Sequence, residues 1–258
     1  TIQRDPVGSA FFTATRRTNK QTVRMYHMMR ELGWLGTDGK ILKRDEVAAA
    51  YETDPAKLAD RLGQRWTLAE TSFKFHASCR HTHPAADALQ QLMRDHQLAA
   101  GQVARVTAQV HQGAIDVLGP VVQPTTVHQS KFSMGTVLAL VAQHGHAGLT
   151  EFDRDFLSQQ TQALRDKVTM ELDAEVDGAY PKRWIGKVTV TTTDGRVLHG
   201  RVDEPKGDPG NTLSRQEITD KALRLAAFSG GATPEAMRQS VDALWQVASW
   251  PKVGALLS

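Results

Sequence analysis

The chain has 258 residues, of which 40% are hydrophobic and 23% charged, and its formal net charge is +3. A chain of this length and composition can bury a sizeable core, so it is expected to be globular and not disordered. Opposite charges are interspersed, and no apolar stretch approaches the roughly 20 residues that a bilayer-spanning helix needs. We therefore expect neither a nucleic-acid partner nor a membrane partner.

The single cysteine, Cys79, excludes an internal disulfide. The opening residues also lack the basic segment and long apolar core of a signal peptide. A reducing cytoplasm is therefore the expected location.

Residues 1–20 show no clear periodicity and are expected to form a loop or an extended arm. Three helical patterns follow, over residues 23–33, 43–52 and 54–63. A stronger one covers residues 83–96, where Pro84 suits the first turn. The apolar face of this helix is predicted to consist of Ala85, Ala86, Leu89, Leu92 and Met93.

The middle of the chain mixes strand and helix patterns. Residues 103–111 alternate as a strand does. The alternation predicts one face made of Val103, Arg105, Thr107 and Gln109 and another made of Ala104, Val106, Ala108 and Val110. Helices are predicted over residues 133–145 and 150–167, and strands over 168–175, 184–193 and 196–202. The last two strands flank Asp194–Gly195, which predicts a hairpin.

Two helices are expected to finish the chain, over residues 214–228 and 233–250. Ser214 and Glu217 form a capping-box pattern at the start of the first. The pattern as a whole indicates an α+β unit inserted between helical segments. We expect helical residues 1–71, an α+β domain over 72–205, and C-terminal helices over 206–258 that return to the helical part.

The densest cluster of chemically active side chains is KFHASCRHTHP, residues 74–84. His76, His81 and His83 suggest a metal site, but the spacing lacks a second ligand pair such as CxxC or HExxH. Cys79 with His83 or His81 as its base suggests a nucleophile, although the local signatures of known cysteine proteases are absent. The third alternative is a solvated loop that caps the following helix. The cluster alone leaves all three open.

Three segments in order carry a resemblance to a known family: residues 73–89, 130–140 and 204–226. Together they resemble the MmgE/PrpD family, which includes 2-methylcitrate dehydratases, cis-aconitate decarboxylases and iminodisuccinate epimerases. The first family signature is approximately K-x-Y-P-x-C-x-x-x-H, and Lys74, Cys79 and His83 fall on its Lys, Cys and His positions.

The resemblance implies an all-helical part plus an inserted α+β lid, with the active site in the cleft between them. It also implies no cofactor and no metal, and a small carboxylate as substrate. Members move a proton next to a carboxylate and eliminate water or carbon dioxide, or epimerise. Lys74 is then expected to hold a carboxylate or stabilise negative charge, His83 to act as an acid or base, and Cys79 to line the pocket. His76 and His81 become bystanders.

Further substrate-binding residues implied by the resemblance are Arg17, Lys131 and Ser133. The sequence departs from the family at two places. His76–Ala77 replaces the usual Tyr–Pro, and Gly135–Thr136 stands where many members have Pro–Tyr.

The resemblance leads to two functional expectations. The first is a carbon–oxygen lyase similar to 2-methylcitrate dehydratase. The second is a truncated or degenerate member without catalysis, because the family's N-terminal half precedes anything present here and the chain opens on Thr1. We expect the isolated chain to turn over little or nothing, and to form a homodimer or associate with a missing N-terminal half.

Overall fold

The computed structural model describes residues 30–31, 33, 36, 61 and 63–252. The arm predicted over residues 1–20 and the helices predicted over 23–33, 43–52 and 54–63 lie wholly or mostly outside these residues. Residues 70–258 cluster as one compact unit, which is described below.

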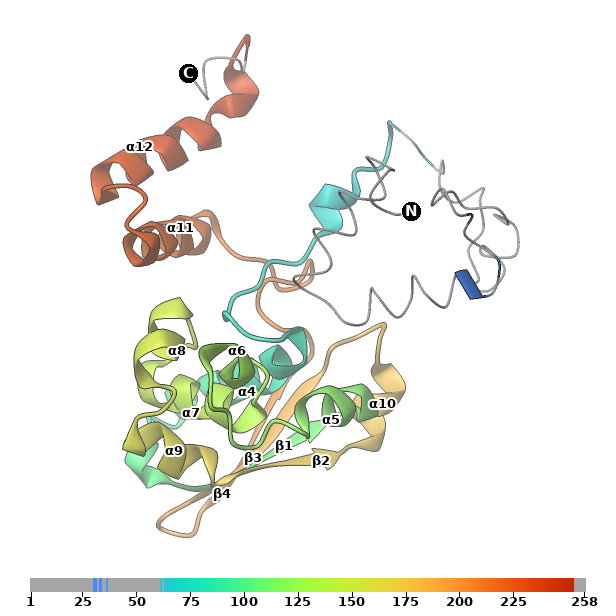
Figure 1. Ribbon diagram of the computed structural model, residues 1–258, viewed down its shortest axis with the longest axis vertical. Coiled ribbons are helices and arrows are strands. Elements are labelled where there is room, and N and C mark those ends of the chain that lie inside the picture. Colours follow the sequence, from blue (N-terminus) through green and yellow to red (C-terminus); the bar gives the residue numbers. More distant parts are fainter. Residues whose placement is uncertain (1–29, 32, 34–35, 37–60, 62, 253–258) are drawn as a thin grey trace. The chain divides into compact units, whose positions relative to one another are not determined.

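The unit contains a mixed sheet of four strands in the order β2–β1–β3–β4 (Figure 1). The strands are β1 (Val103–Val110), β2 (Val168–Leu172), β3 (Gly186–Thr192) and β4 (Val197–Val202). β1 runs parallel to β2 and antiparallel to β3, while β3 and β4 form the hairpin predicted around Asp194–Gly195. This mixture of helices and strands agrees with the predicted α+β class.

Two helices pack beside the sheet and supply much of the core. Helix α4 (His83–Asp95) contacts β3 and β4, and α7 (Met134–His144) contacts α4 and β2. Both confirm sequence predictions, because their apolar residues recur at helical spacing and bury one face. The predicted face of α4 is buried, with every member 7% exposed or less: Ala85, Ala86, Leu89, Leu92 and Met93.

The predicted faces of β1 are wrong at its first two residues, because Ala104 is exposed although alternation places it with Val106, Ala108 and Val110. Val103 is only 1% exposed and shares the core with Val106, Ala108 and Val110, although simple alternation places it on the opposite face. The register with β3 shifts between Val103 and Arg105. A register shift of this kind turns the side chain before it toward the other face of the sheet. The alternation of residue types along the sequence does not reveal such a shift.

The helix predicted over 150–167 is two helices, α8 (Leu149–Asp155) and α9 (Gln159–Arg165). Ser158 separates them, because its hydroxyl accepts a hydrogen bond from the Thr161 N–H and starts a new helix. The strand predicted over 168–175 ends early, at Leu172, because a helix cap follows it as well. Asp173 caps α10 (Ala174–Ala179) by accepting from the Glu175 and Val176 N–H groups.

Several short elements were not predicted. They are the helices α5 (Gln112–Leu118) and α6 (Val127–Ser130) and the 3-10 helices η3 (Thr67–Glu70), η4 (Arg80–Thr82), η5 (Ala100–Gln102) and η6 (Val247–Ser249). Each is too short to show a reliable period.

The two C-terminal helices are α11 (Arg215–Ser229) and α12 (Pro234–Trp245). The Ser214 hydroxyl accepts from the Glu217 N–H, and the Glu217 carboxylate accepts from the Ser214 N–H at 2.7 Å, so the predicted capping box is confirmed. α11 and α12 contact each other.

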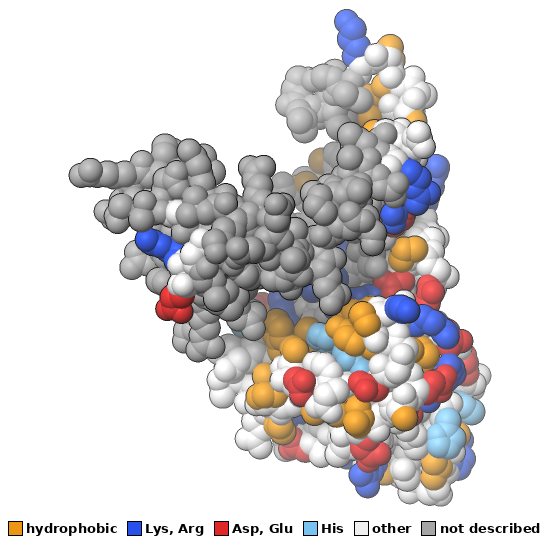
Figure 2. Space-filling model, turned by 90° about the vertical axis from the view of Figure 1, so that its right-hand side faces the viewer, with side chains coloured by type: hydrophobic (Ala, Val, Ile, Leu, Met, Phe, Trp, Pro, Cys, Tyr) orange, Lys and Arg blue, Asp and Glu red, His pale blue; other side chains and the backbone are white. Residues whose placement is uncertain are grey.

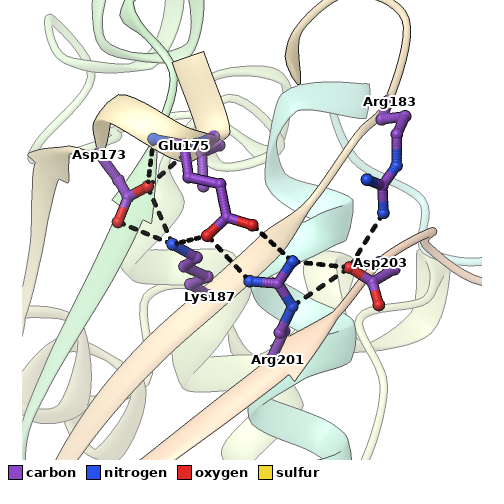
Figure 3. A network of polar contacts seen from close by, with 7 residues as sticks. Asp173, Glu175, Arg183, Lys187, Arg201 and Asp203 are labelled. Atoms are coloured by element: carbon purple, nitrogen blue, oxygen red, sulfur yellow. Dashed lines mark hydrogen bonds and ion pairs between the residues drawn. The ribbon is translucent and has the colours of Figure 1, made fainter. Parts of the chain in front are cut away.

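An ion-pair network joins α10 to the two hairpin strands (Figure 3). Lys187 pairs with Asp173 and Glu175, and Arg201 pairs with Glu175 and Asp203. The hydrogen bond with Arg201, followed by that with Lys187, lowers the pKa of Glu175 to about 2.

On the face of the molecule in Figure 2, acidic and basic side chains are intermixed over the described residues. None of the described helices has the length and apolar character required to cross a membrane.

Candidate active site

The candidate site is built on the loop before α4 and the loop after β4. The Phe73 N–H donates to the Gly207 carbonyl at 2.8 Å, and the Lys206 N–H donates to Asp87 Oδ2 at 2.6 Å. Gly207 has a φ of +98° and lies against the Phe73 carbonyl, so a side chain there would be both strained and obstructed. The first and third segments of the resemblance are therefore bonded to each other.

His76 is buried beneath the loop before α4 and holds that loop in place. Its side chain is fully buried, its Nδ1 accepts from the Ala147 N–H at 3.2 Å, and its Nε2 lies 2.9 Å from Asp87 Oδ1. Because Nδ1 accepts, Nε2 carries the proton and donates to Asp87. His76 thus has a defined structural role in positioning the loop that carries Lys74 and Cys79.

The second segment joins the site through the backbone. The Cys79 N–H donates to the Lys131 carbonyl at 2.8 Å. The Lys131 ammonium lies 5.8 Å from the centre of the Phe152 ring. Ser133 is 1% exposed, and its hydroxyl caps α7 by accepting from the Thr136 N–H. In this structure the Ser133 hydroxyl therefore stabilises the start of α7.

A cleft of about 580 Å³ opens beside these loops. Its lining includes four cationic and two acidic side chains, so its formal charge is +2. The charged residues are Lys74, Arg80, Lys182, Arg183, Glu204 and Asp208. A cationic cleft of this size suits a small organic anion.

Lys74 lines this cleft, and its ammonium donates to the Ser78 carbonyl at 3.1 Å. Among the described residues no carboxylate pairs with it. The positive charge of Lys74 is therefore free to interact with an anion in the cleft.

His83 occupies a different environment from Lys74. It is fully buried, its ring centre lies 5.4 Å from that of His76, and neither ring nitrogen has a hydrogen-bond partner among the described residues. Burial lowers the pKa of His83 well below its usual value, and the nearby charges of Arg80 and Lys74 act in the same direction. A backbone interaction with Ser78 acts in the opposite direction. His83 is therefore neutral near pH 7.

Of the three expected catalytic residues, only Lys74 is among those that line the cleft. Cys79 is partly buried and packs against the hydrophobic core. Arg17 lies outside the described residues.

One cluster of aromatic and histidine side chains next to the cleft was not predicted from the sequence. His81 Nδ1 lies 3.2 Å from His111 Nε2, and His111 stacks on Tyr180 with ring centres 3.8 Å apart. Trp184 packs its ring against His81 and His111 and also lines the cleft. Burial lowers the pKa of both histidines. These residues come from three separate segments of the sequence, so no local motif indicated the cluster.

No three His, Cys, Asp or Glu side chains within the described part of the chain converge as a metal-binding group. A family model described as the MmgE/PrpD C-terminal domain matches residues 76–247. The comparison with curated proteins returns no match.

Proposed function

Because the chain belongs to the MmgE/PrpD family, we propose that it functions as, or as part of, a cofactor-independent lyase for a small di- or tricarboxylate. The reaction is the dehydration of a substrate similar to 2-methylcitrate. A proton leaves the carbon next to a carboxylate, the hydroxyl group leaves the neighbouring carbon, the two depart as one water, and a C=C double bond forms.

The observation that carries this proposal is the position of Lys74. Its ammonium faces a cleft of net positive charge and has no carboxylate partner in the described part of the chain. Removal of a proton next to a carboxylate builds negative charge on that carboxylate, and a cation beside it, such as the ammonium of the exposed Lys74, stabilises that charge. Lys74 is the proposed group that holds this carboxylate.

His83 is the proposed acid or base, in its neutral form, which can accept a proton. Its ring must become accessible before it can exchange a proton with a substrate, since it is fully buried in this unit. Both ring nitrogens lack partners among the described residues and can make new hydrogen bonds without breaking old ones. Cys79 is proposed to border the bound substrate, although it is not among the residues that line the cleft in this unit.

The second candidate is a binding fragment without catalysis. The burial of His83 and the position of Cys79 away from the cleft lining favour it. The proposed assembly, as a homodimer or with a second chain, and the proposed cytoplasmic location apply to both candidates.

The test measures binding and turnover with the same protein. The chain is mixed with 2-methylcitrate or citrate, and the formation of the conjugated double bond is followed by ultraviolet absorbance. Thermal unfolding then reports binding, because a ligand at 100 times its Kd adds about 2.7 kcal/mol to the free energy of unfolding. We expect Lys74→Ala to abolish binding, together with any turnover that the unmodified chain shows.

Lys167→Ala is the matched control. The Lys167 ammonium also donates to a backbone carbonyl, that of Val103, but it does not line the cleft. Binding without turnover that depends on Lys74 would favour the second candidate. Absence of binding by the unmodified chain, or equal binding by Lys74→Ala, contradicts the proposed function.

A further inference from the structure

The cleft contains a second cation whose surroundings differ from those of Lys74. Arg80 lies in η4 and lines the same cleft. Its Nη2 forms an ion pair with Asp208, and its guanidinium carbon lies 5.3 Å from the centre of the Trp184 ring. An ion pair on one side and an aromatic ring on another hold the planar group in one orientation.

This orientation leaves Arg80 with unused hydrogen-bonding capacity. A guanidinium offers five N–H donors. The only hydrogen bond of this side chain among the described residues joins Nη2 to Asp208, and Nη1 is buried with no partner. A buried N–H group without a partner is unfavourable, so an anion to which Nη1 becomes accessible would remove an existing cost.

The other cations of the cleft are less suited to this role. Arg183 already pairs with Asp203 at 3.1 Å, and Asp203 in turn lies between Arg183 and Arg201 (Figure 3). Lys182 is exposed, as Lys74 is, and no contact with another described residue fixes its ammonium near Arg80. Arg80 is half-buried, fixed in orientation and incompletely paired.

Lys74 and Arg80 are also held relative to each other. Phe73, next to Lys74, is hydrogen-bonded to Gly207, and Arg80 is paired with the adjacent Asp208. The backbone beside Lys74 and the side chain of Arg80 are thus anchored to consecutive residues of one loop, and this preorganisation lowers the entropic cost of binding a ligand with two anionic groups.

We infer that Arg80 is a specificity-determining residue that binds a second carboxylate of the substrate, so that the cleft selects di- and tricarboxylates over monocarboxylates. This inference rests on the proposed function, in which Lys74 holds the first carboxylate. Arg80 adds the requirement for a second carboxylate on the same ligand.

Isothermal titration of the whole chain tests the inference with three unreactive ligands: tricarballylate, glutarate and butyrate, which carry three, two and one carboxylates. Arg80→Gln should weaken tricarballylate and glutarate binding by about 10- to 100-fold, the loss typical of a hydrogen bond to a charged group. Butyrate binding should not change. Arg80→Lys should give an intermediate loss, because it keeps the charge without the planar fork.

Two further variants distinguish a loss of ligand binding from a loss of folding. Arg80→Gln leaves Asp208 without its cation, so the double variant Arg80→Gln/Asp208→Asn is measured beside it and should show the same loss of selectivity. Arg94→Gln is the matched control, because Arg94 is exposed on α4 and does not line the cleft.

Retention of the original ratio of tricarballylate to butyrate affinity in both Arg80 variants would overturn the inference and leave the proposed function standing. If the unmodified chain binds none of the three ligands, the proposed function and the inference both fail.

Discussion

At the scale of single residues, His76 and His83 show how neighbouring buried histidines can differ. Both are fully buried, and their ring centres are 5.4 Å apart. His76 has a partner on each ring nitrogen, whereas His83 has none among the described residues. A buried polar group without partners lowers stability, and one with both partners positions the groups it contacts.

The contrast predicts effects of different size on stability for the same substitution at the two positions. His76→Leu leaves the Asp87 carboxylate and the Ala147 N–H without their partner, and should lower the free energy of unfolding by about 3 kcal/mol. His83→Leu removes unpaired nitrogens and should change it by less than about 1 kcal/mol. Urea denaturation of the two variants measures both values. A larger loss for His83→Leu would show that its ring has a structural partner.

The lowered pKa values of His81, His83 and His111 predict a loss of stability in mild acid. Below about pH 6.5 the unfolded chain protonates these histidines while the folded chain does not. The unfolded state then binds more protons, so stability falls as the pH falls, by at most about 1.4 kcal/mol per pH unit for each such group. Denaturation at pH 7.5, 6.5 and 5.5 measures this slope.

His83→Leu provides the control for the pH experiment. The variant lacks the histidine with the most strongly lowered pKa and should lose less stability between pH 6.5 and pH 5.5 than the unmodified chain. An identical slope in the two proteins would contradict the assignment of a lowered pKa to His83.

At the scale of elements, the contact between β3 and α4 depends on a close backbone approach. A Cβ atom at Gly186 would overlap the Pro84 carbonyl at the start of α4. Gly186→Ala must therefore separate the strand from the helix and should cost about 3 kcal/mol of stability. Gly178→Ala in α10 meets no atom within 4 Å and should stabilise the unit by about 0.5 kcal/mol. Thermal denaturation of both variants compares them, and equal effects would contradict the close approach.

The helices and strands that the sequence predicted correctly are those whose signal is local. α4 and α7 have long apolar faces, α11 has its Ser214–Glu217 capping box, and the β3–β4 hairpin has its Asp-Gly turn. The break between α8 and α9 was missed because one serine cap outweighs a continuous helical pattern. The parallel pairing of β1 with β2 is non-local, and no residue pattern within either strand encodes it.

At the scale of the whole unit, the order of three distant segments predicted the family, and the family model matches residues 76–247. The sequence also drew attention to Lys74, which does line the cleft. It could not indicate Trp184 or Asp208 as neighbours of Arg80, because pairing across the fold brings them together. Nor could it reveal that His76 is fully paired and His83 is not, since this depends on partners supplied by the whole fold.

The positive charge of the cleft predicts a salt dependence that increases with ligand charge. Added salt shortens the screening length from about 10 Å at 0.1 M to about 3 Å at 1 M. The affinity for tricarballylate should therefore fall more steeply with salt than the affinity for butyrate. Titrations at the two salt concentrations measure both slopes, and Arg80→Gln should make the tricarballylate slope shallower. Equal slopes for the two ligands in the unmodified chain would contradict a role for the net charge.

The anchoring of the cleft to the loop after β4 has a consequence for protein synthesis. Asp87 and Lys206 are 119 residues apart, and Arg80 and Asp208 are 128 residues apart. A ribosome that adds about 5 to 20 residues per second makes Asp208 roughly 6 to 26 seconds after Arg80. During that interval Lys74 and Arg80 are already part of the nascent chain, but the loop that fixes their positions does not yet exist. The anion site can therefore form only when most of the unit has been translated.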